Sequence, residues 1–425
     1  MTTVVKGGTI IDETGARAGD VVIGDDGRIA AVGADLTGDV VVDAGGCVVA
    51  PGLVDLHTHL REPGREESET VETGSRAAAL GGFTAVVAMP NTEPAIDCAA
   101  VVREVLELGQ KAGLVDVRSS GAITVGRKGE SLAPMAEMAA LGVRLFTDDG
   151  AGVQDNRLMR RALEYASGLG VTLAQHCEDD ALAAGGHMHE GEWSSRLGIP
   201  GIPAEAEELM VLRDIALARL TGASVHFQHL STAGSLAMVR AAKAGGLPVT
   251  AEATTHHFTL TDECCKSYDP LFKVNPPLRG ASDVAAVKAG LAEGTLDAIA
   301  TDHAPHAQEL KEQAFDEAPP GMLGLETALA LAITELDLDL AQVIGLLAWQ
   351  PAAIAGLSDV HGGPIVEGRP ANLCVIDPNA TWVVDPQAVA SRSRNTPYAG
   401  RTLTGRVRHT FLWGEPVVLD GEATR

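Results

Sequence analysis

Apolar and polar positions are patterned differently at the ends of the chain and in its middle. The first fifty residues read as short strands separated by Gly/Asp turns, and GDDGRI at 24–29 is typical of a hairpin. The tail has the same character, in NLCVIDP, ATWVV and RVRHTFLWGEPVV. Since two β-rich ends flank a long middle, we expect one small β-domain built from residues 1–52 and 362–425.

The middle alternates apolar or β-branched runs with Ala/Leu-rich helical stretches. The runs are LVDLHTH, TAVVAMPNT, DVRSSGAIT, VRLFTDDG, VTLAQHCED, SVHFQHLST, PVTAEATTHH and LDAIATDHAPH. Strands alternating with helices favour a parallel sheet, and eight such units close a barrel. We therefore predict an α/β fold with a (β/α)8 TIM barrel over residues 53–361. The connection after the fifth run, about residues 180–206, has the length of a functional or mobile loop.

Composition and charge narrow the class of protein. At 425 residues, the chain has room for a barrel of about 250 residues and a smaller module. We expect a soluble cytoplasmic protein, because the sequence has no apolar run of about 20 residues and no signal-peptide pattern at the N-terminus. The net charge of −25 argues against nucleic acid or anionic membrane as a partner, and an anionic substrate would need a local basic anchor. The six cysteines are dispersed, without a CxxC pair, as is typical of reduced thiols.

Metal-binding residue types recur where the predicted strands end. The C-terminal ends of barrel strands face one mouth, so these residues should converge. HTH closes the first run, and alternation puts both of its imidazoles on the same face. The candidate ligands are His57, His59, Asp149, His176, His229 and Asp302. Four imidazoles and two carboxylates suit zinc or a similar divalent ion. We prefer Asp149 to Asp148 for this role, and His303 should point to the opposite side of its strand.

Three further residues near these ligands can hold an anionic substrate. Arg61, two residues beyond His59, can form a bidentate pair with a carboxylate. Asn91, in MPNT after the second run, offers an amide donor, and His306, in TDHAPH, offers another polar contact.

Several strings together resemble a known family. PGLVDLHTHLREPG, TDDG, QHCED, HFQHLS and ATDHAPH look like the amidohydrolase superfamily, and within it the bacterial type I dihydroorotases. The resemblance covers essentially the whole chain, including a β-sandwich split between both ends. HxH alone indicates only the superfamily, whereas HTHLREPG, FTDDG and TDHAPH in this order are far more specific. Related hydantoinases, allantoinases and other dihydroorotases carry a carboxylated lysine on strand four. The type I enzymes use an aspartate there, which falls on Asp149.

The resemblance implies a reaction and a metal content. It implies a zinc-dependent dihydroorotase that reversibly interconverts (S)-dihydroorotate plus water and N-carbamoyl-L-aspartate, in de novo pyrimidine (UMP) biosynthesis. It also implies two Zn²⁺ ions per chain, bridged by Asp149 and hydroxide. One ion would take His57, His59 and Asp302, and the other His176 and His229. Asp302 would in addition move the proton from the attacking hydroxide to the departing nitrogen.

The resemblance also assigns the substrate contacts. Arg61, Asn91 and His306 would hold the substrate carboxylate. Asn275, in KVNPPLR, and the backbone of Pro320 and Gly321 would hold the edge of the pyrimidine ring. The loop AQELKEQAFDEAPPGMLG, which contains the last two residues, would border the site.

Two alternatives stay open at this stage. One is a cyclic amidase of the hydantoinase, dihydropyrimidinase or allantoinase type. The other is a catalytically silent homologue that serves as a scaffold for aspartate transcarbamoylase. A homodimer is expected, and an active enzyme could also assemble with aspartate transcarbamoylase.

Overall fold

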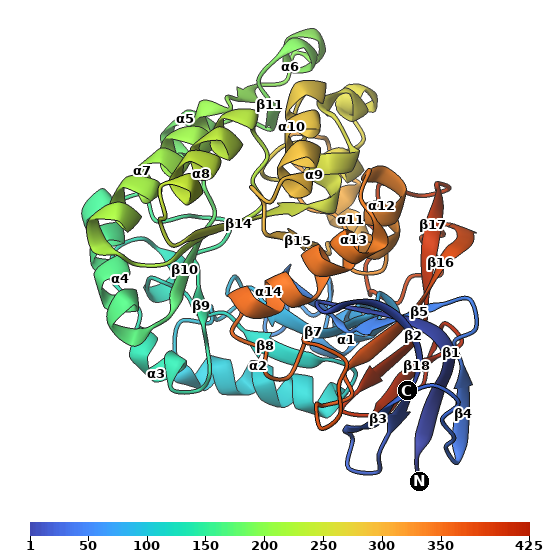
Figure 1. The fold of residues 1–425 in the computed structure, drawn as a ribbon. Helices are drawn as coiled ribbons and strands as arrows, with labels where there is room; N and C mark the ends of the chain where they lie inside the picture. Colours follow the sequence, from blue (N-terminus) through green and yellow to red (C-terminus); the bar gives the residue numbers. More distant parts are fainter.

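The computed structural model describes residues 1–425, and a ring of eight parallel strands lies at its centre (Figure 1). The strands are β6 (Leu53–Thr58), β7 (Phe83–Ala88), β8 (Asp116–Ser119), β9 (Leu145–Phe146), β10 (Thr172–Gln175), β13 (Val225–Phe227), β14 (Val249–Thr254) and β15 (Ala298–Ala300). They pair in the orders β6-β7-β8 and β15-β14-β13-β10-β9. Single parallel bridges, Gly121 to Phe146 and Thr58 to His303, join the two groups into a ring. Seven of the eight predicted runs contain one of these strands whole and the second contains all of β7 except Phe83, so the predicted barrel is confirmed.

Helices surround the ring. The longer ones are α1 (Val71–Leu80), α2 (Ala99–Ala112), α4 (Asn156–Leu169), α7 (Glu205–Thr221), α8 (Ala233–Ala244), α10 (Ala281–Ala292), α12 (Ala328–Glu335) and α13 (Leu340–Leu347). The shorter ones are α3 (Met135–Ala139), α5 (Asp180–Ala183), α6 (Glu192–Leu197), α9 (Thr255–Thr259), α11 (Gln308–Lys311), α14 (Trp349–Ile354) and the 3-10 turns η1 (Val125–Arg127), η2 (Asp262–Ser267) and η3 (Pro270–Phe272). None of the helices combines the length and apolarity that a membrane span requires.

The closed end of the barrel is apolar. Val54 and Leu56 of β6 and Val87 of β7 pack in one cluster with Ala352 of α14 and with Leu357. Alanine, valine and leucine fill this interior because the chain has few aromatic residues. Since α14 covers this end, only the opposite mouth, at the C-terminal ends of the strands, is left for polar side chains.

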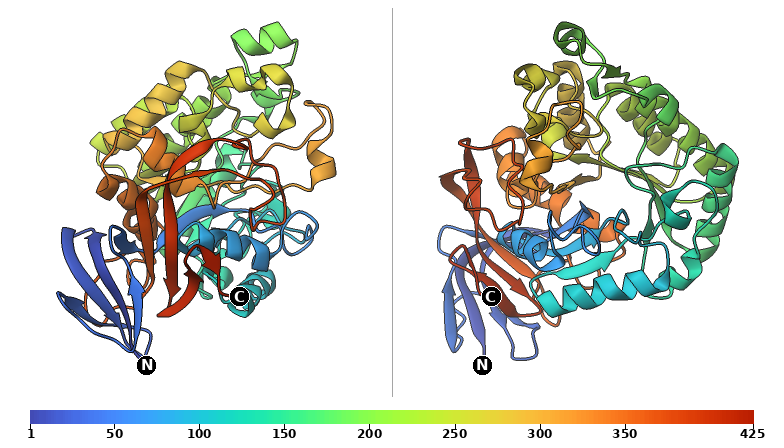
Figure 2. Two further views of the ribbon diagram at one scale, coloured as in Figure 1. Left: turned by 90° about the vertical axis from the view of Figure 1, so that its right-hand side faces the viewer. Right: turned by 180° about the vertical axis from the view of Figure 1, so that it is seen from behind.

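Strands from both ends of the chain form one mixed sheet beside the barrel (Figures 1 and 2). They are β1 (Thr3–Asp12), β2 (Gly15–Ile23), β3 (Ile29–Gly33), β4 (Val40–Asp43), β5 (Val48–Pro51), β16 (Leu373–Val383), β17 (Thr402–Leu412), β18 (Glu415–Leu419) and β19 (Glu422–Ala423). The N-terminal β5 pairs antiparallel with the C-terminal β16, and the predicted GDDGRI hairpin joins β2 and β3. Val5, Ile10, Val21 and Phe411 pack together in a separate core. The β-sandwich formed from both termini is therefore also confirmed.

The long connection after β10 has secondary structure of its own. It contains α5, β11 (Met188–His189), α6 and β12 (Gly201–Ile202), and β11 pairs with β12. In Figure 1, α6 forms the tip at the top of the molecule. The segment is thus an ordered excursion on the mouth side of the barrel.

Candidate metal centre and substrate cavity

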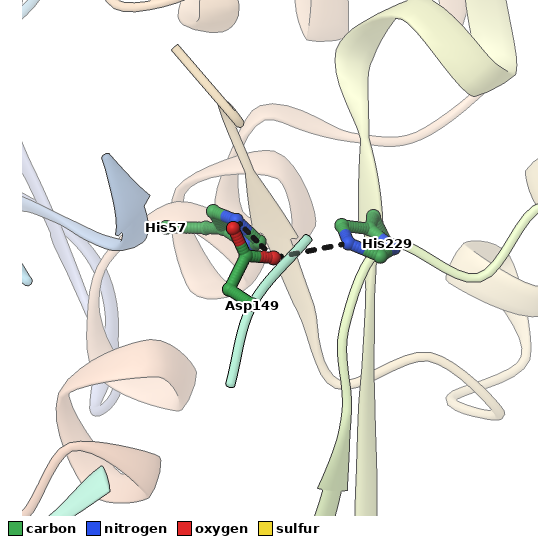
Figure 3. Close-up of side chains that lie close together, drawn as sticks. All are labelled: His57, Asp149 and His229. Atoms are coloured by element: carbon green, nitrogen blue, oxygen red, sulfur yellow. Dashed lines mark ion pairs between the residues drawn. The ribbon is translucent and has the colours of Figure 1, made fainter. Parts of the chain in front are cut away.

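The six predicted ligands converge at the mouth of the barrel, and all are buried. His57 Nε2 lies 3.3 Å from Asp149 Oδ1, and His229 Nε2 lies 3.6 Å from the same oxygen. Figure 3 shows these two imidazoles pointing toward Asp149 from opposite sides. His59 Nε2 lies 2.9 Å from Asp302 Oδ1, and His176 Nδ1 lies 3.7 Å from Asp149 Oδ1. Two ligand sets are compact enough for a cation, His57 with His59 and Asp302, and His57 with Asp149 and His229.

The tautomer of His57 shows that the cluster fits a cation. Its Nδ1 lies 3.0 Å from Glu252 Oε1, and the other oxygen of Glu252 lies 3.0 Å from His226 Nε2. Burial raises the pKa of Glu252, but the bonds from His226 and His57 outweigh it and lower that pKa to about 2. Because the carboxylate must accept, Nδ1 of His57 donates, and the neutral ring presents a lone pair at Nε2. That nitrogen is buried, has no hydrogen-bond partner and faces carboxylate oxygens of Asp149 and Asp302.

The cluster as a whole needs positive charge. Burial lowers the pKa of His57, but Asp149 and Asp302 outweigh it and hold that pKa well above its ordinary value. A proton on His57 would satisfy only part of the cluster. His59 donates through Nδ1 to Asn91 Oδ1 at 2.8 Å, which leaves its Nε2 lone pair against Asp302. His176 Nδ1 and His229 Nε2 also face each other at 3.0 Å. Divalent cations among these nitrogen and oxygen donors would satisfy all of these contacts together.

Two ligands adopt a backbone conformation that residues other than glycine rarely adopt. The φ angle is 33° at His229 and 44° at Asp302, each two residues beyond the end of its strand. Such conformations cost of order 1–3 kcal/mol and persist where the surrounding structure imposes them, often at functional sites. Here the turn directs both side chains into the mouth of the barrel.

A cavity of about 230 Å³ lies over the cluster. Its walls include all of the predicted substrate contacts, which are Arg61, Asn91, Asn275, His306, Pro320 and Gly321. The predicted ligands His59, Asp149, His176, His229 and Asp302 form its floor, and His57 is fully buried without lining it. The remaining lining residues are Arg65, Gly150, Val274, Ala304 and Pro319.

Two arginines, Arg61 and Arg65, line the cavity, and Arg61 is the buried one. Burial lowers the pKa of Arg61 to about 10, so its guanidinium stays charged at neutral pH. Its Nε donates to Pro305 O at 3.1 Å and its Nη2 lies 3.5 Å from His306 Nε2, which fixes the group and leaves Nη1 for an anion. Burial and the charge of Arg61 lower the pKa of His306 to about 2, so His306 is neutral, and its Nε2 lies 2.8 Å from Pro320 O.

The other side of the cavity offers acceptors. Asn275 donates through Nδ2 to Glu178 at 3.1 Å, while its buried Oδ1 has no partner. The N–H of Gly321 already donates to Lys273 O at 2.9 Å, so this backbone presents carbonyl oxygens. A Cβ at Gly321, where φ is 140°, would lie 2.8 Å from His306 Nε2, so only glycine fits this close approach.

Sequence reasoning missed residues that hold the site in place. Glu252 is the partner of His57, and the sequence signal that could have found it was a carboxylate inside a strand that otherwise holds only valine, alanine and threonine. Asn395 donates to Ala304 O at 3.0 Å and to Gly321 O at 3.2 Å, and it accepts from His306 N. No local pattern marks Asn395, because it reaches the mouth from the C-terminal part of the chain.

Asp148 and His303, which the sequence analysis did not choose as metal ligands, lie away from the ligand cluster. Asp148 accepts from the backbone of Ile123 and Thr124, away from the cavity. His303 points away from the ligands, with its Nε2 3.1 Å from Glu69.

The family model and the curated relatives that match this chain point to the same family. A family model described as "Dihydro-orotase-like" matches residues 46–235. The chain is 50% identical to a protein named Dihydroorotase from Pelotomaculum thermopropionicum and to one of the same name from Streptomyces coelicolor, over 99% of each chain in both cases. It is 50% identical to a Dihydroorotase from Mycobacterium tuberculosis over 95% of both chains. Among solved structures, the L-hydantoinase (dihydropyrimidinase) from Arthrobacter aurescens matches with a TM-score of 0.88 at 24% identity, covering 100% of this chain and 97% of that one. At that identity, the likeness shows a shared fold.

Proposed function

The chain belongs to the dihydroorotase family and is a cyclic amide hydrolase, and we propose that it interconverts (S)-dihydroorotate plus water and N-carbamoyl-L-aspartate. The observation that carries this proposal is the cavity itself, in which a buried arginine stands directly beside the converging imidazoles and carboxylates. Such a pocket can hold a small carboxylate while an amide bond is opened next to it. The reverse reaction closes the ring and would supply de novo pyrimidine biosynthesis, in the cytoplasm.

We propose that the ligand cluster holds two Zn²⁺ ions. His57, His59 and Asp302 would hold one ion, His176 and His229 the other, and Asp149 would contact both. When bound, zinc supplies a Lewis acid for the amide carbonyl and lowers the pKa of water from about 15.7 toward 7. Glu252 would keep His57 in the tautomer that presents Nε2.

Asp302 is the catalytic residue of this proposal. It lines the cavity and would therefore contact a substrate bound there. Burial opposes its ionisation, but His57 and His59 outweigh burial and hold the pKa of its carboxyl well below the usual range. Asp302 is thus a carboxylate at neutral pH, able to accept the proton of the attacking water and to deliver it to the departing amide nitrogen.

The remaining cavity residues would orient the substrate. Arg61 would pair with the carboxylate of dihydroorotate, with the Asn91 amide and His306 beside it. On the opposite side, Asn275 Oδ1 and the carbonyls of Pro320 and Gly321 would accept the N–H groups of the ring. This division places anion recognition and ring recognition on separate walls.

Three further expectations are retained as proposals. Residues 1–52 and 362–425 form the β-sandwich domain and residues 53–361 the catalytic barrel. The protein forms a homodimer. It could also assemble with aspartate transcarbamoylase. Such an assembly would contain an active enzyme and not a silent scaffold, because every proposed ligand is present at the mouth.

Turnover of dihydroorotate, compared with hydantoin and allantoin, tests the proposed reaction. We expect dihydroorotate to be hydrolysed and the other two to be turned over about 5- to 150-fold more slowly, because a polar group left unpaired in a buried site costs about 1–3 kcal/mol. Equal turnover of hydantoin would favour the cyclic amidase alternative. No turnover of any substrate by the zinc-loaded protein would favour the silent homologue.

A further inference from the structure

One acceptor in the wall of the substrate cavity is buried and has no hydrogen-bond partner. It is the side-chain oxygen Oδ1 of Asn275, a residue that lines the cavity. The other cavity-lining side chains with such an atom are His176 and His229, which are proposed metal ligands. Because buried polar atoms normally have a partner, Asn275 Oδ1 is placed to accept from a bound ligand.

The backbone on both sides of Asn275 is held in place. Before it, Lys273 O accepts from Gly321 N at 2.9 Å. After it, Pro276 O lies 2.9 Å from His257 Nε2, which must donate because a carbonyl can only accept. These contacts fix where the side chain starts, but they do not decide which end of its amide faces the cavity. Turning the amide over would exchange the acceptor Oδ1 for the donor Nδ2.

Glu178 decides the orientation of the amide. Its Oε1 lies 3.1 Å from Asn275 Nδ2, in the one hydrogen bond that the amide makes. A carboxylate offers only acceptors, so the NH2 end of the amide must point to Glu178 and Oδ1 away from it. Burial raises the pKa of Glu178, but the bond from Asn275 and the charge of Arg279 limit the rise, so the group is a carboxylate at neutral pH.

The carboxylate that orients Asn275 comes from the strand end that carries a proposed metal ligand. His176 follows β10 directly, and Glu178 N donates to His176 O at 3.2 Å. Glu178 O accepts from Gln154 Nε2 at 2.9 Å. The backbone of Glu178 is therefore held at both its N–H and its C=O, and its side chain lies half-buried beside Asn275.

The other acceptors on this wall already have donors. Pro320 O accepts from His306 Nε2 at 2.8 Å. Gly321 O accepts from Asn395 Nδ2 at 3.2 Å. Asn275 Oδ1 is thus the acceptor of this wall whose whole capacity is left for a ligand, and its orientation determines what the wall can bind.

We propose that Glu178 is a positioning residue, which holds Asn275 as an acceptor and so selects rings that present a free N–H group to this wall. The inference rests on the proposed function, in which Asn275 accepts from the ring edge of dihydroorotate. With the amide reversed, two donors would oppose each other and each would lose its partner. Cyclic ureides and imides with an unsubstituted N–H would therefore be accepted, and rings alkylated at that nitrogen rejected.

Equilibrium titration of the zinc-loaded full chain with orotate tests the proposal. Orotate keeps the carboxylate and the ring N–H groups of dihydroorotate, and its binding is measured without turnover. Glu178→Met removes the acceptor and frees the amide to rotate, so it should weaken orotate binding at least about 5-fold, the lower end of the cost of an unpaired buried polar group. Glu178→Gln keeps an oxygen that can accept from Asn275 and should restore most of the affinity. The zinc content of both variants should equal that of the unmodified chain.

Glu335→Met is the matched control for the loss of a carboxylate. Glu335 is half-buried at the end of α12, pairs with Lys288 and does not line the cavity. Its variant should bind orotate as the unmodified chain does, because no contact of Glu335 reaches the cavity wall.

A double-mutant cycle with Asn275→Ala tests whether Glu178 acts through Asn275. Asn275→Ala should itself weaken orotate binding, and adding Glu178→Met should then have no further effect. In dihydroorotate hydrolysis, Glu178→Met should raise KM and leave kcat nearly unchanged. Additive losses, or full orotate affinity in Glu178→Met, would overturn the proposal, and so would an unmodified chain that does not bind orotate. An unmodified chain that binds orotate without hydrolysing dihydroorotate would instead refute the proposed reaction, and the titration would still decide the role of Glu178.

Discussion

His57 Nδ1 lies 3.0 Å from Oε1 of Glu252, in a part of the barrel mouth closed to solvent. This contact selects the His57 tautomer whose Nε2 lone pair faces the carboxylates of Asp149 and Asp302. Glu252 is in turn held by His226, 3.0 Å from its other oxygen. A carboxylate that touches no substrate therefore orients a proposed metal ligand.

Replacing Glu252 by glutamine should weaken zinc binding without removing the site. The amide is nearly isosteric but accepts the His57 N–H less strongly, and loss of such a partner typically costs about 10–100-fold in metal affinity. Competition with a chromophoric chelator would measure the change. Asp116→Asn is the control, since Asp116 also pairs with a buried histidine, His361, away from the cavity. Equal zinc affinity in Glu252→Gln and the unmodified chain would refute the orienting role.

Replacing Asp302 by asparagine should lower kcat by at least about 10³-fold. Proton transfer by a positioned carboxylate contributes about 10²–10⁴-fold, and the substitution also impairs a proposed metal ligand. Steady-state kinetics at saturating zinc, with zinc counted per chain, would separate the two losses. A variant with full zinc content and near-normal kcat would show that another group moves the proton.

Replacing Arg61 by methionine should raise KM for dihydroorotate and leave the zinc content unchanged. Methionine preserves much of the side-chain length but removes the charged hydrogen bonds, which are worth about 1.5–3 kcal/mol, or roughly 10–150-fold in affinity. Kinetics and metal analysis of the same preparation would check both statements. Loss of zinc with substrate affinity intact would reverse the division of roles between Arg61 and the ligands.

How far the sequence predicts this site depends on how local each contact is. HTH at the end of β6 is predictable because alternation along a strand puts His57 and His59 on the same face, and the barrel then gathers the other strand ends. Asp149 is preferred to Asp148 from the sequence, but the contacts that hold Asp148 away from the cavity could not be foreseen, because the backbone of residues 123–124 that it accepts from is remote in sequence. Asn395 could not be foreseen, since it meets Gly321 and His306 only through tertiary packing.

The same limit applies to the fold. Eight strands followed from periodicity, but the excursion after β10 read only as a long loop. Its two strands are short, with two residues each, too few to show an alternation of polar and apolar positions. Their pairing depends on the chain folding back on itself, which no local pattern records.

Lys311 should make the folded chain more stable as the pH rises from 7 to about 10. It is buried beside the cavity wall, where its Nζ donates to Pro319 O at 2.9 Å, and burial lowers the pKa of its ammonium group to about 7. Between pH 7 and the ordinary lysine pKa of about 10.4, the unfolded chain binds this proton and the folded chain does not, so the free energy of unfolding increases with pH. Below pH 7 the folded chain carries the cost of a buried charge.

Denaturant unfolding of Lys311→Met beside the unmodified chain would measure this effect. Methionine keeps the length of the side chain and cannot titrate, so the variant should lose the part of the pH dependence that Lys311 contributes. Other titrating groups are common to both proteins and cancel in the comparison. Identical pH profiles would mean that Lys311 keeps an ordinary pKa in the folded chain.

The most direct test of the metal-dependent mechanism is dihydroorotate hydrolysis by chelator-treated protein during stepwise return of zinc, with bound zinc counted per chain. We expect no turnover by the metal-free protein and activity that rises until two zinc ions are bound per chain. Full turnover by protein that contains no metal would contradict the account.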